Sequence, residues 1–445
     1  MNKELTSGNV TKTMILFAGP MILGNLLQQC YNLADTLIVG RYLGAGALAS
    51  VGAAYTLMTF LTSVLIGLCM GSGSVVAFYF GRNDVKKMKG AIAASFLFIG
   101  IASVILNLLV FAGIDPILSL LQIPEELGEM MREYVWIIFG GIFFVFLYNY
   151  YAYILRAIGN SFIPLVFLAV STVGNIVLDY VFVVPLHRGI GGAAEATVLS
   201  QVAAGVGIGI YTWWKQPMLR FGKTDMDSAK RGMKEVVRFS VAASVQQSVM
   251  NFGILMIQGL VNSFGTAVMA AFAVAVKIDS FAYMPAQEFA NAFSIFISQN
   301  HGAGKKERVK QGVTSAVKTS VVFCAFVSII IFAFAPQLMQ LFVKASETEI
   351  IAIGTGYLRV EGSFYCGIGI LFLLYGYYRA IGKPEMSVVL TIISLGTRVL
   401  LAYMLAPMPK IGVWGIWWAI PIGWFLADAT GLLYMRKLKR NSKEI

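Results

Sequence analysis

The sequence predicts an all-α integral membrane protein, with twelve transmembrane helices in two pseudo-symmetric six-helix bundles around a central cleft. Of its 445 residues, 58% are hydrophobic and only 13% are charged, whereas a soluble domain carries about 25% charged residues. Long apolar runs recur along the whole chain, and its two halves resemble each other. These three observations leave no room for a sizeable soluble domain.

Twelve apolar segments are each long enough to cross a bilayer, which takes ~20 mainly apolar residues. Because the bilayer core offers no water to the backbone, such segments must be helices or a closed barrel, and runs of this length favour helices. The predicted spans are 14–39, 46–79, 90–115, 131–155, 162–185, 192–214, 235–262, 267–298, 313–343, 351–378, 386–407 and 412–435. The first span is too long for a signal-peptide core, so we expect it to be retained.

The lysine and arginine residues predict the orientation of these spans. Of the 34 such residues, 24 fall on the side that holds both termini, 5 fall on the opposite side and the rest lie within spans. Cytoplasmic loops of membrane proteins carry this kind of excess. We therefore expect a multi-pass protein of the cell membrane with both termini in the cytoplasm. The net charge of +12 then follows from topology, and we expect no nucleic-acid partner.

An internal repeat relates the two halves at an offset of 221–223 residues. Four pairs of segments recur in the same order, which is the signature of a duplicated unit. They are Arg156-Ala-Ile-Gly159 with Arg379-Ala-Ile-Gly382, Gly81 with Gly302, Leu43-Gly44-Ala45 with Phe264-Gly265-Thr266, and Gly189-x-x-Gly192 with Gly412-x-x-Gly415.

The repeat predicts an N-terminal six-helix bundle over 1–214, a cytoplasmic linker over 215–234 and a C-terminal six-helix bundle over 235–445. Six is an even number of spans, so both halves enter the membrane from the same side and their symmetry axis runs along the membrane normal. Two such bundles that rock about a midplane cleft give alternating access. This architecture favours a carrier over a channel.

Two polar stripes on apolar helices are candidates for the lining of that cleft. Pro20 is positioned to bend the first of these helices. The stripes are Asn25, Gln28, Asn32 and Asp35 in the first half, and Gln247, Asn251, Gln258 and Asn262 in the second. Interhelical hydrogen bonds, worth ~1 kcal/mol each, are the alternative. The symmetric placement of the stripes favours cavity lining.

Four polar residues of the first half are predicted to share one depth in the membrane. Asp35 lies in the outer third of the first helix, Asn175 and Asp179 share a face of the fifth, and Thr197 comes early in the sixth. Such an all-oxygen cluster suits a hard monovalent cation, and burial would let one carboxylate hold a proton instead. A static polar network is the alternative.

Charged residues also occur within the other spans, and each costs ~2.5–3.5 kcal/mol on insertion scales. Glu288 and Glu361 are candidates for attracting a cationic substrate. For several of the other charged residues, an Arg–acid pair between helices is the alternative to a role in transport. The sequence assigns no role to Lys277, Asp279, Arg359, Arg398 and Asp428.

No pattern of soluble catalysis occurs, so we expect no enzyme and no catalytic residues. The two histidines lie in loops, and GxGxxG, Walker and HExxH contexts are absent from the sequence. We expect no structural metal and no cofactor other than a coupling ion, H⁺ or Na⁺. Without an ATP-binding loop, the work must come from an ion gradient, and a membrane potential supplies ~2.3 kcal/mol per charge per 100 mV.

The set of residues resembles the multidrug and toxic compound extrusion (MATE) family over nearly the whole chain. The residues that carry the resemblance are Pro20, Gln28 and Asp35 before Val39-Gly40, the paired RAIG segments, Asn175 with Asp179, Gly189-x-x-Gly192-Ala-Ala-x-Ala-Thr197, and Gln299-Asn300-x-Gly302-Ala303-Gly304.

The resemblance implies export of bulky, often cationic amphiphiles in exchange for H⁺ or Na⁺. It also implies that the cation site consists of Asp35, Asn175, Asp179 and Thr197. One departure is that helix seven has no carboxylate beyond Glu235, which argues against a second cation site in the C-terminal half. We expect small-molecule substrates, contact with membrane lipid and function as a monomer.

Three alternatives remain. The first is a lipid-linked oligosaccharide flippase of the same superfamily, which would more often show a strongly basic cavity. The second is a major-facilitator carrier. The loop Gly81-Arg-Asn-Asp84 of this sequence lacks the pattern of the corresponding loop in that class. The third is a channel or a receptor, which the repeat disfavours.

Overall fold

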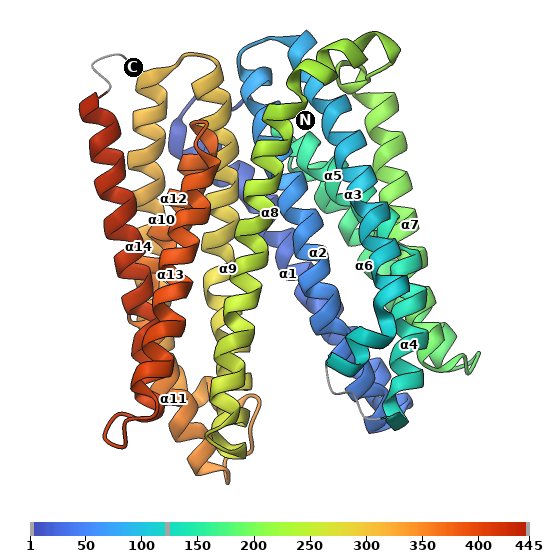
Figure 1. The fold of residues 1–445 in the computed structure, drawn as a ribbon, viewed down its shortest axis with the longest axis vertical. Coiled ribbons are helices and arrows are strands. Elements are labelled where there is room, and N and C mark those ends of the chain that lie inside the picture. The colour runs from blue at the N-terminus through green and yellow to red at the C-terminus, as the bar shows by residue number, and fades with distance from the viewer. Residues whose placement is uncertain (1–3, 121–124, 442–445) are drawn as a thin grey trace. The chain divides into compact units, whose positions relative to one another are not determined.

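The computed structural model describes residues 4–120 and 125–441, and every regular element in these ranges is a helix (Figure 1). The α-helices of the first half are α1 (Val10–Tyr42), α2 (Gly44–Gly81), α3 (Val85–Leu120), α4 (Glu125–Gly140), α5 (Ile142–Ala157), α6 (Phe162–Val183) and α7 (Gly189–Lys215). Two 3₁₀ turns follow, η1 (Pro217–Leu219) and η2 (Lys223–Asp225). The second half contains α8 (Met226–Asn262), α9 (Thr266–Gly302), α10 (Lys306–Gln340), α11 (Thr348–Gly362), α12 (Tyr365–Ala380), α13 (Pro384–Leu405) and α14 (Val413–Asn441). The predicted all-α membrane fold is confirmed.

Ten of the helices in the described ranges are long and apolar enough to cross a membrane, and two bent helix pairs bring the total to twelve. This agrees with the twelve predicted spans. Lys3 and Lys443, which contribute to the predicted cytoplasmic excess, lie outside the described residues, as do the outermost ends of the two predicted bundles.

The fourth and tenth spans are broken, where the sequence analysis expected continuous helices. α4 and α5 meet at a bend of 45°, and α11 and α12 meet at a bend of 52°. The first break falls at Gly140-Gly141 and the second directly after Gly362. Glycine weakens a helix interior by roughly 0.5–1 kcal/mol relative to alanine, so both bends occur where the helix is least stable. The breaks lie at matching places in the two halves.

The helices α1 and α8 both begin before the apolar runs that predicted them. α1 begins at Val10, where the Asn9 side chain accepts a hydrogen bond from the Lys12 amide at 3.0 Å; this is a typical N-cap. α8 begins at Met226 with Asp227 in its first turn, where a carboxylate is favourable beside the positive end of the helix dipole. Capping chemistry, rather than hydropathy, sets these two ends.

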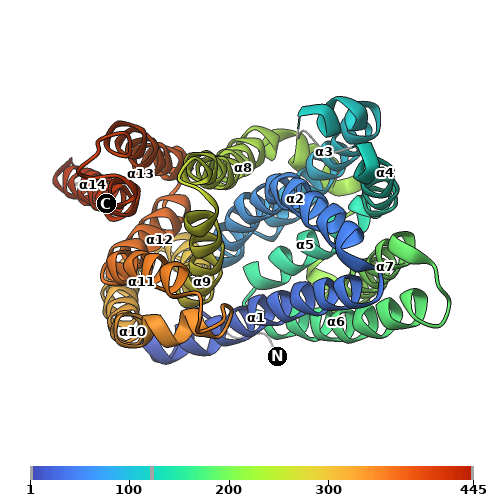
Figure 2. The ribbon, with the colours of Figure 1, turned by 90° about the horizontal axis from the view of Figure 1, so that it is seen from below.

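The described chain divides into two compact units. Unit 1 contains residue 4 and Gly19–Ser244, and unit 2 contains Leu5–Ala18 and from Val245 onward. In unit 1, α7 packs along α5 and α6, while α2 packs on α3 and α5. In unit 2, α9 packs on α10, α11 and α12, and α13 packs along α14, as the view in Figure 2 shows. The predicted division at 214 and 235 stays a prediction.

The repeated RAIG segments end α5 and α12 in the same way. Gly159 and Gly382 adopt positive φ angles of 85° and 84°. The next amide in each, of Asn160 and Lys383, donates at 2.9 Å to a carbonyl five residues earlier. This is a Schellman motif, whose left-handed residue favours glycine. The conformation therefore explains why glycine closes both segments.

Replacing Gly382 by alanine is expected to lower the free energy of unfolding by about 1–2 kcal/mol, because an L-residue is strained in the left-handed conformation. Thermal unfolding of the purified protein in detergent measures this. The control is Gly396→Ala within α13, where an added Cβ meets no atom within 4 Å. Equal melting temperatures for Gly382→Ala and wild type would contradict the strain argument.

Candidate cation site

The four predicted cation-site residues all lie in unit 1 and are all buried. Asp35 on α1 is 8% exposed, Asn175 and Asp179 on α6 are 2% and 0% exposed, and Thr197 on α7 is 2% exposed. The Asn175 amide donates to the Thr197 hydroxyl at 3.3 Å, and Asp179 lies within electrostatic reach of the Asp35 charge. Packing of α6 along α7 thus places three of the four side chains, and α1 supplies the fourth.

Several oxygens of this cluster have no hydrogen-bond donor among the described residues. They are one carboxylate oxygen of Asp35, the amide oxygen of Asn175 and both carboxylate oxygens of Asp179, to which the Asn175 amide comes near without the geometry of a full hydrogen bond. Leaving a buried polar atom unpaired is costly, and a buried charge costs more. A proton or a small hard cation would satisfy these acceptors, since such cations prefer oxygen ligands. The cluster therefore has the chemistry of an ion-exchange site.

Two tyrosines of this site were missed by the sequence analysis. The Tyr31 hydroxyl lies 3.1 Å from the Thr197 hydroxyl, and Tyr134, only 4% exposed on α4, interacts electrostatically with Asp35 and Asp179. Tyr31 stands one helical turn before Asp35, so the helical period could have found it. Tyr134 has no such signal, because only the packing of α4 brings it to α1 and α6.

Replacing Tyr31 by phenylalanine removes the hydroxyl that lies beside Thr197. A net hydrogen bond is worth about 0.5–1.5 kcal/mol, so we expect ion-dependent transport to fall roughly 2- to 10-fold while the protein folds normally. Dye efflux from proteoliposomes at several ion concentrations measures this. Tyr42→Phe, near the end of the same helix, is the control; an equal loss in both variants would show that the Tyr31 hydroxyl has no special part.

The polar stripe of the first helix lies in unit 1. Gln28 is exposed, and the Asn32 amide donates to the Tyr55 hydroxyl on α2 at 3.2 Å. The interhelical hydrogen bond that was the alternative for such residues therefore occurs at Asn32. Gln28 remains a candidate for contact with a substrate.

The polar stripe of α8 lies in unit 2, and its amides bond along their own helix. Asn251 donates to the carbonyl of Gln247 at 3.2 Å, and Gln258 donates to the side chain of Asn262 at 2.9 Å. None of Gln247, Asn251 and Gln258 is fully buried. That the two stripes line one cavity stays a prediction.

The two glutamates predicted to attract a cationic substrate also lie in unit 2. Glu288 on α9 is half-buried and accepts from Asn291 at 3.4 Å. Glu361, at the end of α11, is only 3% exposed and bonds to Tyr357, and one of its oxygens has no hydrogen-bond donor among the described residues.

A second buried acidic cluster surrounds Glu361, which the sequence analysis did not expect. Asp279 on α9 is 3% exposed and accepts from the Tyr365 hydroxyl at 2.6 Å. The charges of Glu361 and of Arg398 on α13 both act on Asp279. Glu361 and Tyr365 lie on either side of the α11–α12 break. Packing of α9 on α11 and α12 therefore brings to one place acids that no sequence spacing relates.

Comparison with known proteins supplies the family. The family model described as MatE matches residues 20–181 and 240–404, which is most of the chain. The chain belongs to the MatE family. The resemblance that the sequence analysis identified is thereby confirmed, and this MatE protein is a membrane transporter rather than an enzyme.

Similar proteins span almost the full length of this MatE chain. A Bacillus subtilis protein named "Probable multidrug resistance protein YpnP" is 30% identical over 435 residues, which cover 97% of this chain and 96% of that one. A second B. subtilis protein, "Probable multidrug resistance protein YoeA", is 29% identical and covers 97% and 94%.

Among solved structures, an outward-facing multidrug resistance MATE family transporter is 25% identical, with a TM-score of 0.92 over 99% of this chain and 98% of that one. The names support multidrug efflux as the general function. Nothing in these comparisons supports the flippase alternative.

Proposed function

We propose that this protein is a cation-coupled antiporter, which exports bulky and often cationic amphiphilic compounds by alternating access. The observation that carries the proposal is the buried cluster of Asp35, Asn175, Asp179 and Thr197 with its unpaired oxygens. A transporter of this family whose two carboxylates share one buried site can take up H⁺ or Na⁺ on one side and release it on the other. The names of its relatives support drugs as the cargo.

The site can couple the movement of the ion to that of the drug, because binding of the ion changes the charge of the site. With both carboxylates ionised, mutual repulsion and burial are unfavourable. Binding one proton or one Na⁺ relieves both effects, so the empty and occupied forms favour different surroundings. A drug that binds preferentially to one form then exchanges for the ion, which is the linkage that antiport requires. The protein is proposed to act as a monomer in the cell membrane with both termini in the cytoplasm.

Dye efflux from proteoliposomes tests this proposal. The purified protein is reconstituted, and an inward sodium gradient and an inward proton gradient are imposed separately, each with the membrane potential clamped. We expect one gradient to drive efflux of a cationic dye such as ethidium and the other to have little effect. Equal dye movement with and without either gradient would overturn the coupling, and dye movement in protein-free vesicles measures the leak.

A further inference from the structure

The beginning of α1 packs with the second half of the chain rather than the first. Leu5–Ala18 belong to unit 2, whereas the same helix from Gly19 onward, with Asp35, belongs to unit 1. Leu5 and Phe17 are 0% exposed and Met14 is 1% exposed. Met14, Phe17 and Ala18 follow one helical face, so this short stretch buries an apolar stripe of its own.

Arg308, near the start of α10, holds the backbone of residues 5–8. Its guanidinium donates to the carbonyl of Leu5 at 3.1 Å, to that of Gly8 at 2.6 Å and to that of Ser7. These residues precede α1 and have no helix of their own, so their carbonyls need donors from elsewhere. The five donors of arginine, fixed in a plane, suit such a cluster of acceptors.

Two further side chains, one near the end of α9 and one in the α9–α10 connection, bond to the same segment. Asn300, which is fully buried, donates to the carbonyl of Leu5 at 3.1 Å, and Lys305 donates to that of Thr6 at 2.8 Å. At the second residue of α1, the Thr11 hydroxyl lies 2.6 Å from that of Ser315 on α10. The start of α1 is therefore fastened at several points to one hairpin.

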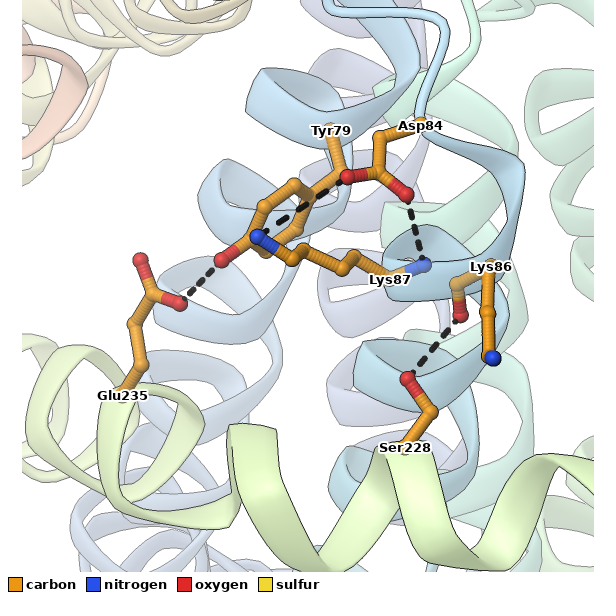
Figure 3. A network of polar contacts seen from close by, with 6 residues as sticks. All are labelled: Tyr79, Asp84, Lys86, Lys87, Ser228 and Glu235. Atoms are coloured by element: carbon orange, nitrogen blue, oxygen red, sulfur yellow. Dashed lines mark hydrogen bonds and ion pairs between the residues drawn. The ribbon is translucent and has the colours of Figure 1, made fainter.

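A corresponding attachment occurs in unit 1, where the start of α8 packs on the α2–α3 connection (Figure 3). The Tyr79 hydroxyl donates to Glu235 at 2.6 Å, and the Lys87 ammonium lies 5.9 Å from the Tyr79 ring centre. The Ser228 hydroxyl donates to the carbonyl of Lys86 at 3.2 Å. Here too, the beginning of a half's first helix is held by the hairpin between two helices.

The two attachments occupy equivalent places in the repeat. At the offset of 221 residues, Ser7 corresponds to Ser228, and Arg308 corresponds to Lys87, whose side chain contacts Asp84 and the Tyr79 ring of its own hairpin. α8 changes units after Ser244, and α1 changes units after Ala18, so the two crossing points agree to within about one and a half helical turns. A feature found at both places of a duplicated fold is part of its architecture rather than a local accident of one loop.

We propose that Arg308 is a positioning residue that anchors the start of α1 to unit 2, and that α1 thereby links the cation site to unit 2. Asp35 lies in the unit 1 part of the same continuous helix. While its start stays fastened to unit 2, α1 is one of two helices, with α8, that continue from one unit into the other, and it is the one that carries Asp35. Without the anchor, the ion would still bind at Asp35, but its binding would no longer bias unit 2. The inference rests on the proposed function, because it concerns how that site drives transport.

Hydrogen exchange tests the anchor without any transport measurement. In Arg308→Ala, we expect the backbone amides of residues 5–18 to exchange faster than in wild type, while those of α14 are unchanged. Arg308→Lys should give an intermediate result, because lysine donates hydrogen bonds but lacks the planar fork. Lys310→Ala is the matched control, since Lys310 pairs with Glu307 on its own helix. Unchanged exchange of residues 5–18 in Arg308→Ala would overturn the anchor, whatever transport does.

Transport then tests the linkage. In Arg308→Ala we expect gradient-driven dye accumulation to fall roughly 2- to 30-fold, the range that mutations along a coupling route produce. Binding of the coupling ion, measured in detergent, should stay at the wild-type level. A loss of ion binding in Arg308→Ala would overturn the linkage, because the residue would then act on the site itself.

A disulfide provides the decisive rescue. With the four native cysteines replaced, Thr11→Cys and Ser315→Cys would join α1 to α10 at a place where the two hydroxyls already touch. In the Arg308→Ala background, oxidation should restore transport and reduction should abolish it again. With Arg308 present, oxidation should leave transport intact. If it stops transport instead, the start of α1 must detach in each cycle, and the anchor is wrong. Wild-type protein without gradient-driven transport would refute the proposed function alone.

Discussion

Replacement of Asp35 by asparagine is expected to abolish ion-driven efflux while leaving the fold intact. Asparagine has nearly the shape of aspartate, but it can neither hold a proton nor contribute a negative charge to a cation. A membrane potential of 100 mV supplies ~2.3 kcal/mol for each charge moved, equivalent to about 50-fold accumulation. The Asp35→Asn variant should lose all of this ion-driven accumulation. Drug resistance conferred on an efflux-deficient host should then fall to the level of the empty vector.

Three measurements separate a loss of coupling from a loss of protein. Expression in the membrane fraction should equal wild type, and drug binding in detergent should persist. Asp179→Asn should behave like Asp35→Asn, because both carboxylates belong to one cluster. Asp115→Asn is the control, since Asp115 is exposed and paired with Arg132. Wild-type resistance in the Asp35→Asn strain would remove Asp35 from the mechanism.

The twelve spans, and the burial of Asp35, Asn175, Asp179 and Thr197 in unit 1, could be predicted because each rests on a local pattern; the role of these residues in cation binding stays a prediction. A span is read from ~20 apolar residues, and Asn175 and Asp179 are one helical turn apart, so any helix places them on one face. Depth in the membrane did the rest, because it assigned Asp35 and Thr197 to the same level. These are arguments about one helix at a time, and bilayer geometry makes them sufficient.

Features that depend on packing between helices could not be predicted in this way. Tyr134 joins the site through the position of α4, and Asp279 comes near Glu361 through the packing of α9 on α11. The attachment of Leu5–Ala18 to unit 2 was equally hidden. No spacing in the sequence relates Leu5 to Arg308.

The close contact of α2 with α8 leads to the second prediction with a large effect. Gly67 and Gly71 face the unit 1 part of α8, and a Cβ added at either would lie less than 3.0 Å from its backbone, at Ser244 and Phe239 respectively. Small residues four apart allow helix backbones to approach this closely within membranes. The obstacle is backbone rather than a movable side chain, so the helices would have to separate.

Gly71→Ala is therefore expected to destabilise the protein by about 1–3 kcal/mol or more, the range of overpacking in a dense interior. Gly232→Ala, within α8, gives the opposite sign. An added Cβ there meets no atom within 4 Å, and alanine favours a helix interior by roughly 0.5–1 kcal/mol. Thermal unfolding in detergent, followed by fluorescence-detected gel filtration, compares the two. Because the α8 segment beside Gly71 also carries the Tyr79–Glu235 contact, Gly71→Ala should reduce transport as well, and a fully stable, fully active variant would show that α2 and α8 do not pack this closely.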